Sequence, residues 1–242
     1  MTGSQPGRPR SLLMIAARAP VSGETKTRLG HAIGMDRAAV LYRAFLRDLA
    51  DRFDSDAAAA SRRYDLAWTY SPPDRDFASD LAEVTGRPAP VSTLYVPQDG
   101  PDWGTRQTNL LRWGADHGYA RTVLMASDSP QLTSDIIDGA FAVLDSREIV
   151  LGRVRDGGYY LIGMRGFVDI LSTVPMSTAS AADGVVQSAR ALGFTIGETE
   201  PTFDIDEASD LNLLIEVLRD DPGLCPASRR ALVDLNPAAF TP

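Results

Sequence analysis

Residues 121–130, Arg-Thr-Val-Leu-Met-Ala-Ser-Asp-Ser-Pro, decide the fold that we predict for this chain. The apolar run from Thr122 to Ala126 ends at a polar segment with a proline, which is typical of a buried strand. Asp128 follows the carboxyl end of that strand. Ligands of open α/β sheets bind just beyond this end, where a carboxylate can hold a divalent cation beside a phosphate. The pattern therefore predicts a functional carboxylate, although a turn or a helix cap would use the same residues.

The composition limits the classes of protein to which the chain can belong. Its 242 residues are 44% hydrophobic, which is enough to bury a sizeable core. A formal net charge of -8 argues against a nucleic-acid partner, which needs clustered Lys and Arg, but it allows a small phosphate pocket. The single cysteine, Cys225, excludes an internal disulfide, and two histidines, His31 and His117, argue against a histidine-based metal site or triad.

The N-terminal segment predicts neither a signal peptide nor a membrane anchor. Residues 1–10 are rich in Gly, Pro, Ser and Arg, which predicts a disordered tail. The apolar run from Leu12 to Ala17 is too short to span a bilayer and lacks a cleavage-site pattern. We therefore expect a cytoplasmic protein with no membrane partner. Without a repeat or a low-complexity linker, residues 11–242 are expected to form a single domain.

Strand and helix patterns alternate along most of the chain. Strands are expected at 11–17, 64–70, 91–96, 122–126, 148–153, 159–164 and 195–200. Helices are expected at 35–53, 77–84, 105–117, 133–144, 166–171, 179–192 and 207–220, with an Ala-rich turn or helix end at 55–63 and one more helix in the tail. This alternation predicts an α/β fold with a mainly parallel sheet flanked by helices. The Asp156-Gly-Gly turn joins two strands directly, so an antiparallel pair is also expected.

A basic loop follows the first strand. Arg18, Lys26 and Arg28 lie within one segment that also contains Gly23, in a chain that is acidic overall. Such a loop can wrap a di- or triphosphate, because glycine allows close backbone approach and the cations pair with phosphate oxygens. The spacing of a Walker loop is absent. A solvated basic loop is the alternative, and we favour phosphate binding.

Two further acidic segments are candidates for the same edge of the sheet. Asp156 lies in a glycine turn beside Tyr159, which can offer a ring or a hydroxyl to an acceptor, although Asp-Gly is also common in plain hairpins. Asp204 and Asp206 precede the helix expected at 207–220. One of them could cap that helix while the other ligates a metal that faces Asp128.

Four segments together resemble a known family. They occur in the order Ala16–Leu29, Ala126–Pro130, Val150–Gly163 and Phe203–Asp206. In this order they look like the rSAM/selenodomain-associated transferase 1 family of the glycosyltransferase-A superfamily, over about residues 12–218. This family usually has a tryptophan after the proline near 175, where this chain has Met176, so a ligand contact at that position is not carried over.

The resemblance implies a Rossmann-like glycosyltransferase-A fold and a transferase that depends on Mg²⁺ or Mn²⁺. Asp128-Ser-Pro130 is Asp-x-Pro rather than the Asp-x-Asp of many sugar transferases, and with the basic loop it is similar to molybdenum-cofactor and 2-phospho-L-lactate guanylyltransferases. We therefore predict nucleotidyl transfer from a nucleoside triphosphate to a small phosphorylated or acidic acceptor. Glycosyl transfer from a nucleotide-sugar is the alternative, and a non-catalytic nucleotide-binding protein is a more distant one.

The motifs and the resemblance together predict the site residues. The expected catalytic residues are Lys26, Arg28, Asp128 and Asp156. The expected nucleotide-binding residues are Ala17, Arg18, Gly23, Lys26, Arg28, Arg106 and Ser127. The expected acceptor-binding residues are Asp156, Gly157, Gly158 and Tyr159, and the expected metal ligands are Asp128, Asp204 and Asp206. Trp103 is expected to pack in the fold, although it could stack on a base. The acceptor, the base and the oligomeric state remain open.

Overall fold

A computed structural model of the chain describes residues 10–176, 178–235 and 240. The predicted disordered tail, residues 1–10, therefore lies outside the described residues except for Arg10. No described helix combines the length and the apolar character that crossing a membrane requires.

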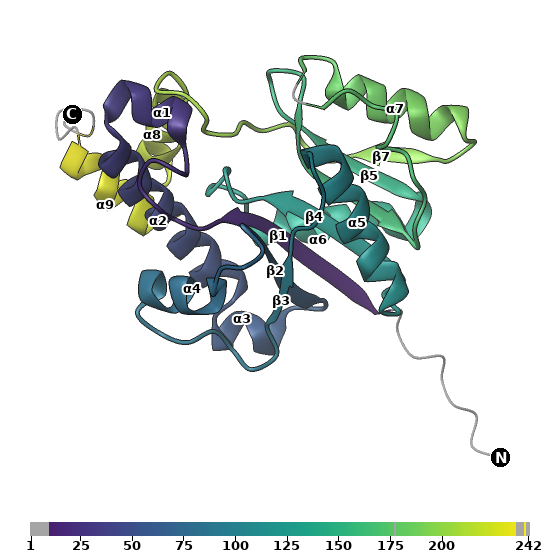
Figure 1. The fold of residues 1–242 in the computed structure, drawn as a ribbon, viewed down its shortest axis with the longest axis horizontal. Helices are drawn as coiled ribbons and strands as arrows, with labels where there is room; N and C mark the ends of the chain where they lie inside the picture. The colour runs from purple at the N-terminus through teal and green to yellow at the C-terminus, as the bar shows by residue number, and fades with distance from the viewer. Residues whose placement is uncertain (1–9, 177, 236–239, 241–242) are drawn as a thin grey trace.

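Seven strands form one mixed sheet in the order β3-β2-β1-β4-β6-β5-β7 (Figure 1). The strands are β1 (Ser11–Arg18), β2 (Asp65–Ser71), β3 (Leu94–Pro97), β4 (Arg121–Ala126), β5 (Ile149–Arg153), β6 (Tyr159–Arg165) and β7 (Ile196–Glu198). β6 is antiparallel to both of its neighbours, and the other pairs are parallel. The predicted antiparallel pair across the Asp156 turn is thus confirmed, and so is the mainly parallel α/β fold.

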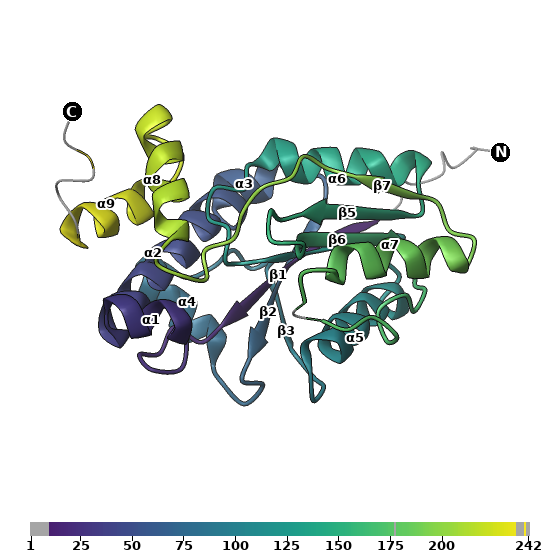
Figure 2. The same cartoon turned by 90° about the horizontal axis from the view of Figure 1, so that it is seen from above.

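Helices cover both faces of this sheet (Figure 2). They are α1 (Thr27–Ile33), α2 (Met35–Phe53), α3 (Asp56–Ser61), α4 (Phe77–Thr85), α5 (Trp103–Asp116), α6 (Ser134–Ser146), α7 (Ala181–Ala191), α8 (Asp210–Asp220) and α9 (Pro226–Leu235). α2, α4, α6, α8 and α9 contribute to the core on one face, and α5 and α7 pack on the other.

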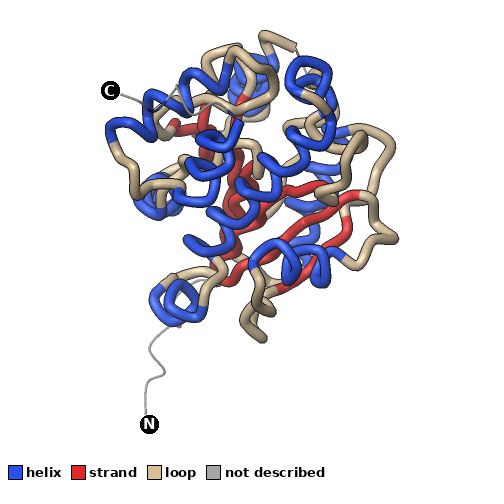
Figure 3. Tube along the Cα trace, turned by 90° about the vertical axis from the view of Figure 1, so that its left-hand side faces the viewer, coloured by secondary structure: helices blue, strands red, loops and turns tan. Residues whose placement is uncertain are grey.

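The strand β1 shows why the sheet needs two layers of helices. Leu13 and Ile15 belong to the core on the α2 side, whereas Leu12 and Met14 belong to the core on the α5 side. Successive side chains of a strand point to opposite faces, so a continuous apolar run is stable only when both faces are covered. Figure 3 shows the strands enclosed by helices in this way.

Several predicted elements differ from the structure. The helix expected at 166–171 is absent, because the Asp169 carboxylate accepts the backbone N–H groups of Leu171 and Ser172 and offers the chain a turn instead. α1 begins at Thr27, inside the segment predicted as loop, and the third strand begins at Leu94 rather than at residue 91.

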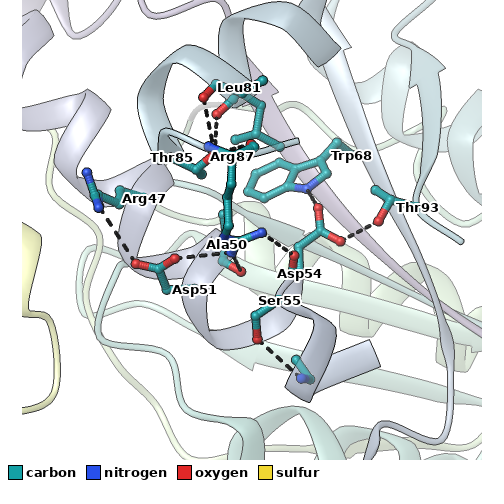
Figure 4. A network of polar contacts seen from close by, with 12 residues as sticks. Arg47, Ala50, Asp51, Asp54, Ser55, Trp68, Leu81, Thr85, Arg87 and Thr93 are labelled. Atoms are coloured by element: carbon teal, nitrogen blue, oxygen red, sulfur yellow. Dashed lines mark hydrogen bonds and ion pairs between the residues drawn. The ribbon is translucent and has the colours of Figure 1, made fainter. Parts of the chain in front are cut away.

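A buried carboxylate ties the end of α2 to the sheet (Figure 4). Asp54 is 1% exposed and accepts hydrogen bonds from Trp68 Nε1 (2.8 Å) and from the Thr93 hydroxyl. Arg87 donates to the Asp54 backbone carbonyl at 3.1 Å. Since a buried carboxylate is stable only when it is hydrogen-bonded, this network fixes α2 against β2 and the chain that leads into β3.

We predict that Asp54→Ala lowers the free energy of unfolding by about 2–4 kcal/mol, because it leaves the Trp68 and Thr93 donors buried without an acceptor. Asp51→Ala is the matched control. Asp51 is about half exposed and pairs with Arg47 and Arg87 at the surface, so its loss should cost no more than about 1 kcal/mol. Urea unfolding of both variants measures the difference, and equal losses would contradict the prediction.

Candidate functional site

The candidate site lies at the carboxyl edge of the parallel strands, where β1 and β4 lie side by side. Ala16 of β1 pairs in register with Ala126 of β4, so the two strands end at the same level. β2 and β3 extend the sheet from β1 in one direction, and β4, β6, β5 and β7 extend it in the other. Where the strand order changes direction in this way, a crevice is left beyond the strand ends, and ligands bind in that crevice. The loops that contain Lys26 and Asp128 flank this crevice.

A third segment, residues 202–206, crosses this edge on its way from β7 to α8 (Figure 1). It is held against the loop after β4, since the Ile205 N–H donates to the Asp128 carbonyl at 3.1 Å. Two side chains of that loop also donate to the Phe203 carbonyl: Ser129 Oγ at 2.9 Å and Gln131 Nε2 at 2.6 Å. These bonds bring Asp206 next to Asp128, although the two are far apart in the sequence.

The Lys26 ammonium lies between these aspartates. Its Nζ atom is 2.7 Å from Asp128 Oδ1 and 3.1 Å from Asp206 Oδ1, and it donates to the Ile205 carbonyl at 2.6 Å. The side chain is only 5% exposed. An ammonium has three donors, and all three have acceptors from the protein here. The two carboxylates that were predicted to need a cation between them therefore have one, and it is a lysine of the same chain.

The backbone and the charge of Lys26 reflect this position. Burial lowers the pKa of the Lys26 ammonium, but the negative charges of Asp128 and Asp206 outweigh it and leave that pKa raised, so the side chain stays cationic. Lys26 has a φ of 49°, in the left-handed region that residues other than glycine rarely adopt. Backbone strain of this kind is often found at functional sites.

Two more charged groups complete the cluster. Arg28 Nη2 lies 2.7 Å from Asp206 Oδ2, and the arginine side chain is 68% exposed. Burial is the main cause that raises the pKa of the Asp204 carboxyl to about 6. The nearby carboxylates of three further aspartates add to this shift: Asp206, Asp156 and Asp128. Local negative charge is therefore in excess around Asp204.

A first cavity of about 350 Å³ lies on the β1 side of this cluster. Its lining includes four cationic side chains and two carboxylates: Arg18, Lys26, Arg28, Arg106, Asp128 and Asp206. It also contains six residues that were predicted to bind a nucleotide: Ala17, Arg18, Lys26, Arg28, Arg106 and Ser127. The structure thus brings these predicted residues together around one space.

A second cavity of about 630 Å³ adjoins the first on the β6 side. It contains three of the predicted acceptor residues, Asp156, Gly158 and Tyr159. Among the described residues, its charged lining consists of one cation and four carboxylates: Arg28, Asp128, Asp156, Asp204 and Asp206. Five residues line both cavities: Arg28, Trp103, Ala126, Asp128 and Asp206. Two ligands could therefore lie side by side, the anionic one in the first cavity.

The aspartates do not cap the helices to which the sequence could have assigned them. Thr133 caps α6 with its own hydroxyl, so Asp128 has no role there. Asp206 does not cap α8 either, because the Asp210 carboxylate accepts the backbone N–H groups of Asp206 and Glu207. Both carboxylates are instead directed to Lys26.

Two of the predicted glycines, Gly23 and Gly157, line neither cavity. The φ of +80° at Gly23 is what requires glycine there, since an added Cβ would meet nothing within 4 Å. An added Cβ at Gly157 would lie 1.8 Å from the Ala179 carbonyl oxygen. Gly157 therefore permits close packing of the turn against the segment before α7.

The predicted metal site is not preformed. Among the described residues, no three His, Cys, Asp or Glu side chains are arranged to hold a metal ion by themselves. Asp128 and Asp206 both contact the same Lys26 nitrogen, so their oxygens are no farther apart than the sum of 2.7 and 3.1 Å. A side-chain rotation that brings these oxygens to within about 4.2 Å, twice the length of a Mg²⁺–oxygen bond, would let both carboxylates serve one Mg²⁺ ion whose remaining ligands are phosphate oxygens and waters.

Several lining residues were not identified from the sequence as parts of the site. The Tyr42 hydroxyl, from the apolar face of α2, bonds Ser127 Oγ at 2.8 Å and accepts the Arg18 N–H at 2.9 Å. Gln98 Nε2 donates to the Ala17 and Thr69 carbonyls at the ends of β1 and β2. Gln98 directly follows a strand, and that position was the available signal. Tyr42 gave none, because its spacing is that of a core residue.

Comparisons with known proteins place this geometry in a family. The profile of a family described as "Uncharacterized protein conserved in bacteria (DUF2064)" matches residues 33–178. The 3-phospho-D-glycerate guanylyltransferase of Phenylobacterium zucineum (strain HLK1) is 27% identical over 202 residues, which cover 82% of this chain and 86% of that protein.

Solved structures agree with the fold. A protein from Desulfovibrio desulfuricans G20, provisionally assigned as a nucleotide-diphospho-sugar transferase, is 29% identical, with a TM-score of 0.83 over 96% of this chain and 97% of its own. A cytidylyltransferase from Leptospira borgpetersenii serovar Hardjo-bovis is 12% identical, with a TM-score of 0.53 over 96% of this chain and 97% of its own. This second similarity concerns the fold alone.

We predict that Asp204→Asn stabilises the protein at neutral pH. In the unfolded chain the Asp204 carboxyl has a pKa of about 3.9, below its pKa in the folded protein. Between about pH 4 and pH 6 the unfolded chain therefore binds fewer protons than the folded one, and the wild type loses stability as pH rises. Asparagine does not titrate. The gain of the variant over the wild type should therefore be small near pH 4.5 and reach on the order of 1 kcal/mol by pH 7.5, after a discount for partial exposure.

Urea unfolding at these two pH values tests whether the stability gain of Asp204→Asn grows as pH rises. Asp74→Asn, at an exposed position outside both cavities, is the control and should show no such pH-dependent gain. A gain for Asp204→Asn that is equal at both pH values would show that the effect is not electrostatic.

Proposed function

The chain belongs to the DUF2064 family of bacterial proteins, and within that family we propose that it transfers a nucleotidyl group from a nucleoside triphosphate to a small acceptor. The observation that carries this proposal is the pair of adjoining cavities, of which the first has four cationic side chains and the second has one. The guanylyltransferase from Phenylobacterium zucineum, similar over most of this chain, supports the same class of transferase. The resemblance to the rSAM/selenodomain-associated transferase 1 family remains a prediction.

The first cavity suits a polyphosphate. Arg18, Lys26, Arg28 and Arg106 outnumber its two carboxylates, and its volume of about 350 Å³ falls at the lower end of small-molecule sites. Guanidinium groups bind phosphate oxygens in pairs, and the exposed Arg28 has donors beyond the one that contacts Asp206. Trp103 lies at the border of both cavities and is 36% exposed, so its ring can stack on a base.

In the proposed reaction an acceptor oxygen attacks the α-phosphorus of the triphosphate. The new P–O bond forms while the bond to pyrophosphate breaks, and pyrophosphate leaves with the electron pair. Reactions of this type depend mainly on positioning and on neutralising charge. Arg28, shared by the two cavities, is suited to hold the reacting groups together. Asp156 would orient the acceptor, or take its proton if the attacking group is a neutral hydroxyl.

The residues fit a Mg²⁺ or Mn²⁺ ion that arrives with the nucleotide. Asp128 and Asp206 are the carboxylates that would hold it, with Asp204 close by, and such an ion would neutralise charge on the donor phosphates. Lys26 lies between Asp128 and Asp206. We infer that Lys26 neutralises these carboxylates in the free protein and is released toward the phosphates when the donor binds.

The role of Lys26 can be tested through metal binding without nucleotide. Lys26→Met keeps an apolar stem of similar length but leaves two carboxylates uncompensated. It should therefore bind Mn²⁺ at least about tenfold more tightly than the wild type, as measured by electron paramagnetic resonance of free Mn²⁺. Arg47→Met removes the same charge from an exposed ion pair on α2 and should leave Mn²⁺ binding unchanged. Equal Mn²⁺ affinity of the wild type and Lys26→Met would exclude the proposed role of Lys26, which is to neutralise Asp128 and Asp206 in the free protein.

A second test separates the two donor types. Isothermal titration in Mg²⁺ should detect binding of at least one nucleoside triphosphate, and Arg28→Met should weaken it about tenfold without loss of stability, because the arginine is largely exposed. Arg47→Met serves again as the charge-matched control. Sugar transfer remains the second candidate, because the 29% identical structure is assigned to nucleotide-diphospho-sugar transfer. Binding and turnover with nucleotide-sugars, and with no triphosphate, would replace nucleotidyl transfer by that candidate.

A further inference from the structure

The charges of the second cavity restrict the acceptor. Among the described residues that line it, Arg28 is the single cation, against four aspartates. Lys26 and Arg28 pair with Asp128 and Asp206, and no ion pair between described residues reaches Asp156 or Asp204. Among the described residues, the Asp156 carboxylate accepts a hydrogen bond from the backbone N–H of Gly158 alone, in its own turn, at 2.9 Å. An anionic group deep in this cavity would thus face carboxylates without a compensating side chain.

Arg28 marks where an anionic group of the acceptor can bind. It lines both cavities, so a phosphate or carboxylate held there would lie beside the donor. One of its nitrogens contacts Asp206, whereas a guanidinium has five N–H donors, so further donors remain for a ligand. The border between the cavities therefore accommodates one anionic group of the acceptor. Because this group lies next to the donor, it is in the position of the attacking group.

The neutral groups of the cavity favour hydroxyls. The Tyr159 hydroxyl donates to Met176 Sδ at 3.3 Å, and Gln107, which is 1% exposed, has its Nε2 atom 4.0 Å from the same sulfur. A thioether is a weak acceptor, so an oxygen of a ligand would be a better partner for both donors. The aspartate oxygens of the same cavity accept hydrogen bonds from ligand hydroxyls. This combination is suited to a polyol or a sugar.

We propose that the acceptor carries one anionic group, bound by Arg28 at the border of the cavities, on an otherwise neutral and hydroxylated body that lies among Asp156, Asp204, Gln107 and Tyr159. The inference rests on the proposed transfer reaction and goes beyond it, since it excludes acceptors with a second anionic group. It also predicts that 3-phospho-D-glycerate, the compound in the name of the relative from Phenylobacterium zucineum, is a poor acceptor for this chain, because that compound carries both a phosphate and a carboxylate.

Matched pairs of compounds test the charge rule. Each pair shares a phosphate and a carbon chain and differs in a hydroxymethyl or a carboxylate group: sn-glycerol 1-phosphate with 3-phospho-D-glycerate, sorbitol 6-phosphate with 6-phosphogluconate, and glucose 1-phosphate with glucuronic acid 1-phosphate. Binding to the full chain is measured by titration calorimetry with Mg²⁺ and α,β-methylene nucleoside triphosphates in both arms. The hydroxymethyl member of a binding pair should bind at least about tenfold more tightly, because a second anion is repelled by nearby carboxylates.

Variants show whether the named carboxylates cause this discrimination. Asp156→Asn and Asp204→Asn should each reduce the preference for the hydroxymethyl compound by about threefold or more. Asp116→Asn, at the end of α5 and outside both cavities, should leave the preference unchanged. A preference for the carboxylate member, or no binding of any hydroxymethyl member, would overturn the inference. If the preference is found but no triphosphate yields pyrophosphate, the proposed reaction fails while the acceptor inference stands.

Discussion

The contact of the Lys26 ammonium with Asp128, Asp206 and the Ile205 carbonyl joins three segments that come from different parts of the chain. A buried ammonium is stable only where acceptors and opposite charges compensate for lost water, so none of these segments can move without exposing the others to an uncompensated charge. The position of the basic loop, the course of residues 202–206 and the boundary between the two cavities all depend on it.

The surrounding fold supports this cluster with bonds that lie outside the cavities. Arg52 of α2 donates to the Pro130 and Leu132 carbonyls at 2.6 and 2.7 Å, which fixes the loop that contains Asp128. Asp48, one turn earlier, accepts the N–H groups of Ala227 and Ser228 at the start of α9. The same helix thus holds both the central loop and the C-terminal helices. This support offsets the mutual repulsion of carboxylates at the site, which is a common cost of function.

Most of the fold, and the charged residues of the site, could be predicted from local patterns. The 121–130 stretch gave β4 and placed Asp128 at the sheet edge, and the apolar spacing of residues 35–53 gave α2 with its bounds. Short elements were less certain, because few residues determine them: the turn at Asp169 replaced a helix. Asp204 and Asp206 were predicted as metal ligands that face Asp128, but the contacts that hold their segment are hydrogen bonds to the loop after β4, which no local pattern encodes.

By itself, then, the sequence determined the α/β alternation, the carboxyl edge as the place of the site, and the residues that carry its charge, because periodicity, turn chemistry and residue type are local properties. Tertiary structure alone decided which cation meets these carboxylates. It put Lys26 between Asp128 and Asp206 rather than on open solvent, gave four cations to the first cavity and one to the second, and added Tyr42 and Gln107 to the lining. Such pairings arise from strand order and loop packing, and electrostatic energy depends on distances in space that sequence spacing does not specify.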